Sequence, residues 1–176
     1  PVSCNGGNNG AINTTVTGGN APYTFSWNGG ATTQNRTALT AGNYFVTVTD
    51  NTGCTATANT TITEPTAITL ASAIANVSCN GVNNGSINLT VTGGISPYNF
   101  AWNDGVVTQN RSGLPAGNYS VTVSDANSCS ASVNASVTQP AAILTNAAPV
   151  NVSCHGASTG SVSLTVAGGT GAYIFN

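Results

Sequence analysis

Five cysteines are the residues of this chain whose type and spacing offer the clearest chemistry. Cys4, Cys79 and Cys154 follow one another at a constant interval of 75 positions, and the same interval separates Cys54 from Cys129. Each of the first two copies of this period therefore holds two cysteines, 50 positions apart. The simplest serial pairing gives two disulfides, Cys4–Cys54 and Cys79–Cys129.

Disulfide bonds explain these cysteines better than a metal site does. In the chain-entropy model, closing a loop of about 50 residues stabilises a domain by roughly 4 kcal/mol, which matters for a small domain with a marginal core. Disulfides also indicate an oxidising, extracellular compartment. Zinc sites need clustered cysteines with histidine, and the sequence has no such cluster. Cys154 is expected to be unpaired in this chain, because the periodicity puts its partner near position 204.

Other reactive side chains are few. General acid–base catalysis usually needs His, Asp, Glu or Lys side chains within hydrogen-bond reach of one another. The sequence has one histidine, His155, and six charged residues, with no lysine. No catalytic residue, metal site or cofactor is expected, and the chain is not expected to be an enzyme. The charged residues are Arg36, Arg111, Asp50, Glu64, Asp104 and Asp125.

The composition of the 176 residues excludes further classes. Two arginines cannot neutralise a phosphate backbone, so no nucleic-acid partner is expected. No apolar run approaches the ~20 residues that a membrane span needs. Disordered chains combine low hydrophobicity with high net charge, whereas here 40% of the residues are hydrophobic and the net charge is −2. The class that remains is an extracellular β protein. The sequence is rich in small residues, with 27 Thr, 24 Asn, 17 Ser and 21 Gly.

The same period extends to the whole sequence. Aligning residues 2–76 with residues 77–151 without a gap gives 43 identities in 75 positions, and a third copy begins at Val152. Pro65 and Pro140 mark the joins, because each follows a predicted strand and cannot donate to a sheet. The joins leave almost no free linker, so the domains are expected to lie end to end.

The expected domains follow from these joins. Residues 1–65 form a first repeat without its first strand, residues 66–140 a complete second repeat, and residues 141–176 the N-terminal part of a third. This pattern is interpreted as a window of a longer tandem array. The alternative is a subunit whose incomplete ends are completed by strands of its neighbours.

Hydrophobic residues alternate with polar ones within each copy, as is typical of half-buried strands. About six or seven short strands per repeat, separated by Asn-Gly, Gly-Gly and Asp-Asn turns and without helical periodicity, predict an all-β fold of tandem immunoglobulin-like sandwiches. The predicted strands lie near residues 12–16, 23–27, 44–48, 67–77, 87–91, 98–102, 119–123, 129–137 and 162–166.

Two aromatic features support this fold. The segment Leu-x-Ala-Gly-Asn-Tyr ends at Tyr44 and again at Tyr119, and it is typical of a tyrosine corner, in which the hydroxyl bonds backbone a few residues upstream. Trp27 and Trp102 end an aromatic strand and are expected to be core residues. The alternative for these tryptophans is stacking on a ligand.

The recurring strings VSCNG-x-NNG, GG-x-x-PY-x-F-x-W and L-x-AGNY-x-VTV-x-D resemble the SprB repeat over essentially the whole chain. This resemblance implies a very large surface adhesin of gliding Gram-negative bacteria. It further implies export by the type IX secretion route, display as cell-surface filaments, and roles in attachment and gliding. The family brings no catalytic residues with it.

The remaining polar residues suggest turns more than sites. Asp50 and Asp125 are expected to cap turns through side-chain-to-backbone bonds, since one carboxylate is too little for Ca²⁺. His155 is expected to lie in a solvated turn. Arg36 and Arg111 are expected to bond loop carbonyls or a carboxylate, with a ligand role as the alternative.

The expected function is therefore the structural and adhesive stalk of an extracellular, cell-surface filament. Its partners would be adjacent repeats, possible neighbouring filament chains, and a surface or glycan ligand whose binding residues are unknown. The alternatives are a secreted array of carbohydrate-binding modules, which exposed aromatics would favour, and a fibre subunit that polymerises by strand complementation.

Overall fold

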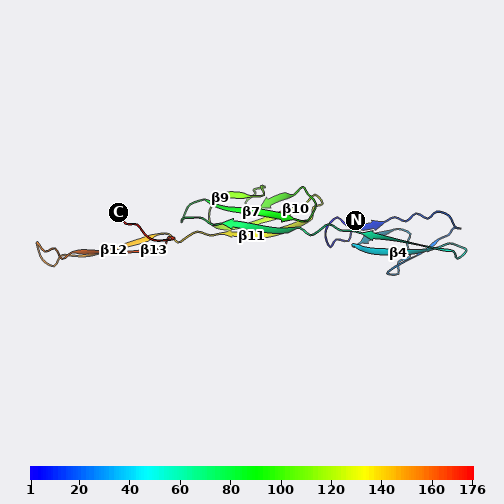
Figure 1. Ribbon diagram of the computed structural model, residues 1–176, viewed down its shortest axis with the longest axis horizontal. Coiled ribbons are helices and arrows are strands. Elements are labelled where there is room, and N and C mark those ends of the chain that lie inside the picture. Colours follow the sequence, from blue (N-terminus) through cyan, green and yellow to red (C-terminus); the bar gives the residue numbers. More distant parts are fainter. The chain divides into compact units, whose positions relative to one another are not determined.

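A computed structural model describes residues 1–176 of the chain, in which every element is a strand and none is a helix (Figure 1). The strands are numbered β1 to β13. They belong to two compact units. Unit 1 comprises Pro1–Leu70, Val91–Asn99 and Val123–Ala131, and unit 2 comprises Ala71–Thr90, Phe100–Thr122 and Ser132–Asn176.

The first repeat forms two small sheets. One has the order β2-β4-β5 and the other pairs β1 with β3. All these pairings are antiparallel, and the β4–β5 ladder runs without interruption from Gly42↔Ile62 to Thr49↔Thr55. The strand bounds are Gly10–Ile12 for β1, Thr24–Trp27 for β2, Arg36–Leu39 for β3, Gly42–Thr49 for β4 and Thr55–Ile62 for β5.

The second repeat has two three-stranded sheets, with the orders β6-β7-β9 and β11-β10-β8. The chain thus passes from one sheet to the other after β7, after β8 and after β9, as it does in an immunoglobulin-like sandwich. The predicted all-β, immunoglobulin-like fold is confirmed. The strand bounds are Thr69–Ala75 for β6, Gly85–Thr92 for β7, Asn99–Trp102 for β8, Arg111–Leu114 for β9, Gly117–Ser124 for β10 and Ser130–Val137 for β11.

The third repeat contributes one antiparallel pair, β12 (Leu144–Val150) with β13 (Ser161–Ala167). The side chains of β12 are exposed along its whole length, and so are most of those of β13. The strand pair therefore has no covered hydrophobic face of its own.

Period-two alternation accounts for the cores. Along β7, Ile87 and Leu89 are buried while Asn88 and Thr90 are exposed, and along β10 the buried residues are Val121 and Val123. In the first repeat, a buried cluster of Val2, Leu39 and Ile62 packs against Ile12, Ala41 and Tyr44. Each sandwich thus buries the apolar side of its alternating strands.

Each of the nine predicted strands has a counterpart in the structure, but four strands of the structure, β3, β5, β9 and β12, were not among them. β3 and β9 have no alternating pattern. The strand predicted near residues 12–16 ends at Ile12, although its counterpart β7 has eight residues. β7 pairs with β6 and with β9, whereas β1 pairs only with β3.

The hydroxyls of Tyr44 and Tyr119 each donate a hydrogen bond to the backbone four residues upstream. Tyr44 donates to the Thr40 carbonyl oxygen at 2.9 Å, and Tyr119 donates to the Pro115 carbonyl oxygen at 3.0 Å. This is the bond that a tyrosine corner makes, and it ties the start of β4 and of β10 to the preceding loop.

Candidate functional site: a disulfide-linked repeat junction

The structure has one disulfide, and it joins Cys4 of the first repeat to Cys129 of the second, with both residues in unit 1. The Cα atoms are 5.6 Å apart, and 125 residues of sequence separate them. The other three cysteines, Cys54, Cys79 and Cys154, carry exposed thiols. The predicted pairs Cys4–Cys54 and Cys79–Cys129 are therefore wrong, because the bond crosses from one repeat to the next.

The length of the last strand explains why the predicted pairs do not form. Cys54 directly precedes β5, whereas the Cys4 turn is bonded to Glu64 and Pro65, which follow β5. An eight-residue strand is roughly 26 Å long, and a disulfide needs Cα atoms within ~7 Å. The two cysteines of the first repeat thus lie at opposite ends of its last strand. The sequence of the second repeat is arranged in the same way, with Cys129 directly before β11.

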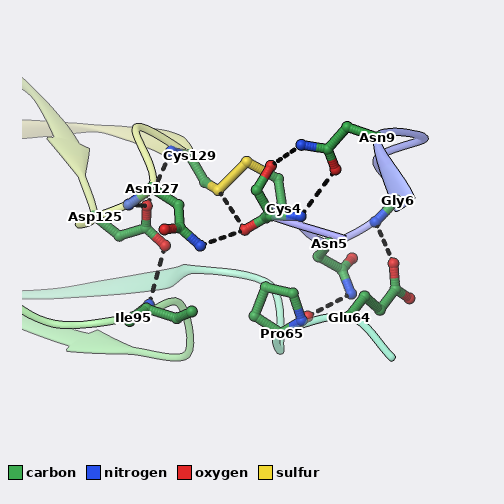
Figure 2. The surroundings of a disulfide bond; sticks show 11 residues. Cys4, Asn5, Gly6, Asn9, Glu64, Pro65, Ile95, Asp125, Asn127 and Cys129 are labelled. Carbon is green, nitrogen blue, oxygen red and sulfur yellow. Dashed lines mark hydrogen bonds between the residues drawn. A yellow bond between two sulfur atoms is a disulfide. The ribbon is translucent and has the colours of Figure 1, made fainter. Parts of the chain in front are cut away.

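The turn that carries Cys4 is fixed to the end of its own repeat. Asn5 donates its side-chain amide to the Pro65 carbonyl oxygen at 3.1 Å, and the Gly6 amide donates to Oε2 of Glu64 at 2.6 Å (Figure 2). The Gly7 amide closes the turn on the Cys4 carbonyl oxygen at 3.0 Å. We call residues 3–7 the cysteine turn. Its bonds hold Cys4 beside the proline join to the second repeat.

The turn that carries Cys129 is organised by one carboxylate. Oδ1 of Asp125 accepts bonds from the amides of Asn127 and Cys129, each at 2.9 Å, and Oδ2 accepts from the Ile95 amide at 3.0 Å (Figure 2). Asp125 is only 3% exposed. Burial alone would raise the pKa of this carboxyl, but the bonds from Ile95, Cys129 and Asn127 together hold the pKa below its usual value. We call residues 125–129 the aspartate turn of the second repeat, and their counterparts, residues 50–54, the aspartate turn of the first repeat.

Two further contacts accompany the disulfide. Asn127 donates its side-chain amide to the Ser3 carbonyl oxygen at 2.8 Å, and the Cys129 sulfur lies 3.3 Å from the same oxygen. The aspartate turn of the second repeat therefore touches the cysteine turn of the first through a covalent bond and a hydrogen bond together.

The linker after Pro65 also packs against the second repeat. The Gly94 amide donates to the Thr66 carbonyl oxygen at 2.9 Å. At Gly93, where φ is +75°, an added Cβ would lie 1.9 Å from the Ala67 carbonyl oxygen. No side chain fits between the glycine and the linker, so the Gly-Gly motif permits this close approach.

The aspartate turn of the first repeat, whose cysteine is free, has the same internal bonds. Asp50 holds this turn as Asp125 holds its own, with Oδ1 accepting from the amides of Thr52 and Cys54 at 2.9 Å. The Thr52 hydroxyl and the Asn20 amide add further bonds, and together these donors lower the pKa of Asp50 from 3.8 to about 2. The prediction that Asp50 and Asp125 cap turns is confirmed by these side-chain-to-backbone bonds.

The arginines lie over the core tryptophans. Arg111 lies 5.2 Å from the Trp102 ring centroid and pairs with both carboxylate oxygens of Asp104, at 3.0 and 2.6 Å. This ion pair lowers the pKa of Asp104. Arg36 lies 5.6 Å from Trp27, but Gly29 stands where the second repeat has Asp104, and Nη1 of Arg36 has no hydrogen-bond partner. The carboxylate predicted as one partner for these arginines thus exists only in the second repeat.

Both tryptophans are 4% exposed, and each ring nitrogen donates to a loop carbonyl at 2.8 Å, Thr33 for Trp27 and Thr108 for Trp102. The hydrogen bond satisfies the N–H group of each indole, and the core covers the rest of the ring. Neither ring offers a face to a ligand.

Unit 1 also contains an open groove of about 390 Å³. One wall of the groove is formed by Thr14–Gly19, which are not in a strand. Strands β4 and β5 also line the groove, with Val46, Val48, Ala56 and Ala58. No three His, Cys, Asp or Glu side chains of the chain gather closely enough to hold a metal ion. No helix of sufficient length and apolarity to cross a membrane is present.

Sequence reasoning identified the cysteines and aspartates of the junction but missed Ser3, Asn5, Glu64 and Asn127. A signal for two of them exists. Asn5 and Glu64 recur one repeat further on as Asn80 and Gln139, which keep an acceptor oxygen at the second position. The Ser3 carbonyl is backbone and leaves no mark in the sequence.

Comparison with known proteins gives a family for this chain. The SprB repeat matches it at three places, residues 1–32, 71–107 and 146–175, which together make up more than half of its length. No curated protein matches. Among solved structures, an amphioxus IgVJ-C2 molecule is 15% identical, with coverage of 76% of this chain and 97% of that chain and a TM-score of 0.34. The chain belongs to the SprB repeat family and is a repeat region of the kind found in cell-surface adhesins.

Proposed function

We propose that the chain is part of the stalk of an extracellular filament, exported by the type IX route, that supports attachment or gliding. The observation that carries this proposal is the Cys4–Cys129 bond, because it ties one repeat covalently to the next. A stalk must transmit force between its repeats, and a bond that crosses the join resists their separation. Disulfides also persist in the oxidising space outside the cell.

The surface chemistry supports a structural role more than a binding role. Two cations and four anions over 176 residues leave a neutral, hydrated coat with little electrostatic steering of ligands. The burial of Trp27 and Trp102 counts against an array of carbohydrate-binding modules, which need exposed aromatic platforms. Phe45 is the exposed aromatic of the first two repeats, and the second repeat has Ser120 in its place.

Labelling of intact cells tests the location and the role. Antibodies against the chain should bind the outside of cells that make the protein, and protease treatment of those cells should remove the signal. Deletion of the repeats from the gene should reduce attachment to glass or the speed of gliding. Labelling only after the cells are broken would refute the proposal. Specific binding of the purified chain in a glycan screen would favour the carbohydrate-binding alternative.

Small-angle scattering tests the shape that a stalk requires. A seven-residue strand rises about 23 Å, and turns bring each repeat to roughly 35–40 Å, so domains that lie end to end should advance by about that distance. A compact chain of this length would have a radius of gyration of roughly 16 Å. A value well above this supports the stalk, and a value near it contradicts the stalk.

Strand complementation is a second candidate function, which the groove of unit 1 favours. Residues 14–19 form one wall of the groove. Residues 14–17 correspond to residues 89–92, which are the part of β7 that continues past Ile87. A peptide with the sequence of residues 66–76, which contains β6, would supply a strand there. Fluorescence anisotropy should detect binding of this peptide but not of a scrambled control. Equal binding of both would remove this candidate.

A further inference from the structure

We propose that Cys79 is one half of a second inter-repeat disulfide, and that such bonds form an overlapping series along any array that continues this period. The partner is the cysteine of an aspartate turn in the following repeat, 125 residues beyond Cys79, the separation found between Cys4 and Cys129. The inference does not depend on what the array attaches to.

The turn around Cys79 is built as the bonded Cys4 turn is. Asn80 donates to the Pro140 carbonyl oxygen at 3.1 Å, the distance found for Asn5 and Pro65. The Gly81 amide donates to Oε1 of Gln139 at 3.0 Å, in the place of the Gly6 bond to Glu64. Cys79 is therefore held beside its proline join in the same way as a cysteine that does form a disulfide.

A hollow lies beside Cys79, and its lining corresponds in part to that of the cavity at the first junction. It has a volume of about 360 Å³, and its walls include Cys79, Asn80, Pro140 and Gly169. The cavity at the first junction is smaller, about 280 Å³, and the counterparts of these residues also line it. There Asp125, Cys129 and Ser130 form a further wall, which the hollow beside Cys79 lacks.

The linker beyond Pro140 makes the same contacts with the third repeat as the linker beyond Pro65 makes with the second. The Gly169 amide donates to the Ala141 carbonyl oxygen at 2.9 Å, as the Gly94 amide does to Thr66. A Cβ on Gly168 would lie 1.9 Å from the Ala142 carbonyl oxygen, the value found for Gly93 and Ala67. In the first junction the aspartate turn of the following repeat forms the remaining wall.

The chain also shows what an aspartate turn looks like when its cysteine is not bonded, at Cys54 in the first repeat. Its amide donates to Oδ1 of Asp50 at 2.9 Å, as the Cys129 amide does to Asp125, and its thiol is exposed. An aspartate turn thus presents its cysteine before any bond forms. When the two thiols join, they lose two protons and two electrons, and a disulfide oxidant accepts them and is reduced to two thiols.

Overlap gives the series a mechanical consequence. Bonds that begin once in each repeat and span 125 residues overlap their neighbours, and the loops closed by every second bond leave only about one sixth of the sequence outside them. A fully unfolded but oxidised array could then reach only roughly 90 Å per two repeats, against about 520 Å without the bonds. The disulfides would make the array nearly inextensible even where its domains unfold.

An extended chain tests the proposal. Adding a copy of residues 102–140 after Asn176 completes the third repeat and puts a copy of Cys129 at position 204. After oxidation with glutathione disulfide, peptide mapping should find the added cysteine bonded to Cys79, with Cys54 and Cys154 as thiols. A bond from the added cysteine to Cys154, or a free thiol in a protease-resistant third repeat, would overturn the proposal.

Two measurements keep the test decisive if the added segment does not fold. In the 176-residue chain, Cys4→Ser should leave Cys129 and Cys79 as thiols, whereas a bond between them would show that pairing within a repeat is allowed and would refute the series. In the extended chain, single-molecule stretching should give a maximum length about 90 Å shorter than in its Cys79→Ser variant. Equal lengths would also refute it.

Discussion

The first and second repeats are identical at 43 of 75 aligned positions, yet they bury the same positions to different extents. Ile87 and Val123 are fully buried, whereas their counterparts Ile12 and Val48 are half-buried. The difference follows the strand content, because β7 has eight residues and pairs with β6, whereas β1 has only three and lacks that partner. The second sandwich, in which β7 has a partner strand on each side, is therefore the better buried of the two.

The largest expected effect comes from breaking the disulfide-linked junction between the two repeats. The Cys4→Ser substitution should lower the free energy of unfolding by roughly 5 kcal/mol, the chain-entropy value for a loop of about 125 residues. Denaturant unfolding monitored by tryptophan fluorescence measures the change. Cys154→Ser is the control and should leave the midpoint unchanged, because Cys154 is a free thiol. Equal midpoints for both variants would show that the inter-repeat bond does not stabilise the first repeat.

Core truncation at matched positions sharpens the comparison. Ile87→Ala should cost about 2–5 kcal/mol, because the side chain is fully buried and leaves a cavity. Ile12→Ala should cost less, about 1–2 kcal/mol, because part of the side chain already contacts water. Hydrogen exchange of the β4 and β10 amides reports each repeat separately. Equal costs would mean that the second partner strand of β7 does not strengthen the second core.

The Gly-Gly motifs provide a smaller, equally matched contrast. Gly93 and Gly18 both have left-handed φ values, +75° and +79°, so alanine is strained at both, by about 1–2 kcal/mol. Only at Gly93 would the added Cβ meet the linker, 1.9 Å from the Ala67 carbonyl oxygen, and Gly18 has open space. Gly93→Ala should therefore cost about 1–3 kcal/mol more than Gly18→Ala in thermal or denaturant unfolding. Similar costs would mean that the linker yields easily.

Alternating residues were sufficient to predict most strands, since period-two patterns mark half-buried strands directly. β3 and β9 were missed because Arg-Thr-Ala-Leu and Arg-Ser-Gly-Leu contain one buried apolar residue each and no alternation. The end of β1 at Ile12 was missed because a strand extends only where a partner strand bonds to it. The alternating pattern of Ile12, Thr14 and Val16 does not show whether a partner strand is present.

The disulfide pairing was wrong because equal spacing is compatible with several connectivities. A pairing within each repeat and a pairing across repeats, with its separation of 125 residues, both preserve the period. The deciding fact is spatial, since the Cys4 turn lies after the end of β5 and Cys54 lies before its start. The predicted long last strand already contained this separation, and adding its length to the argument would have excluded a bond between its two ends.

The smallest effect near neutral pH concerns Asp50 in the aspartate turn of the first repeat, which is half-buried, whereas its counterpart Asp125 is buried. Four donated hydrogen bonds, led by that of the Thr52 hydroxyl, lower the pKa of Asp50 to about 2 from 3.8. A carboxyl whose pKa is lowered on folding contributes stability above its unfolded pKa and loses that contribution as the pH falls through the folded value. The first repeat should therefore keep its unfolding midpoint from pH 7 to about pH 4 and lose stability between about pH 4 and pH 2. In Asp50→Asn the midpoint should be lower at pH 7, because a neutral amide oxygen is a weaker acceptor for the Thr52 and Cys54 amides, and it should change less over the acid range. A variant with an acid transition as large as that of the parent chain would assign the titration to other carboxylates, of which Asp125, also with a lowered pKa, is the next to substitute.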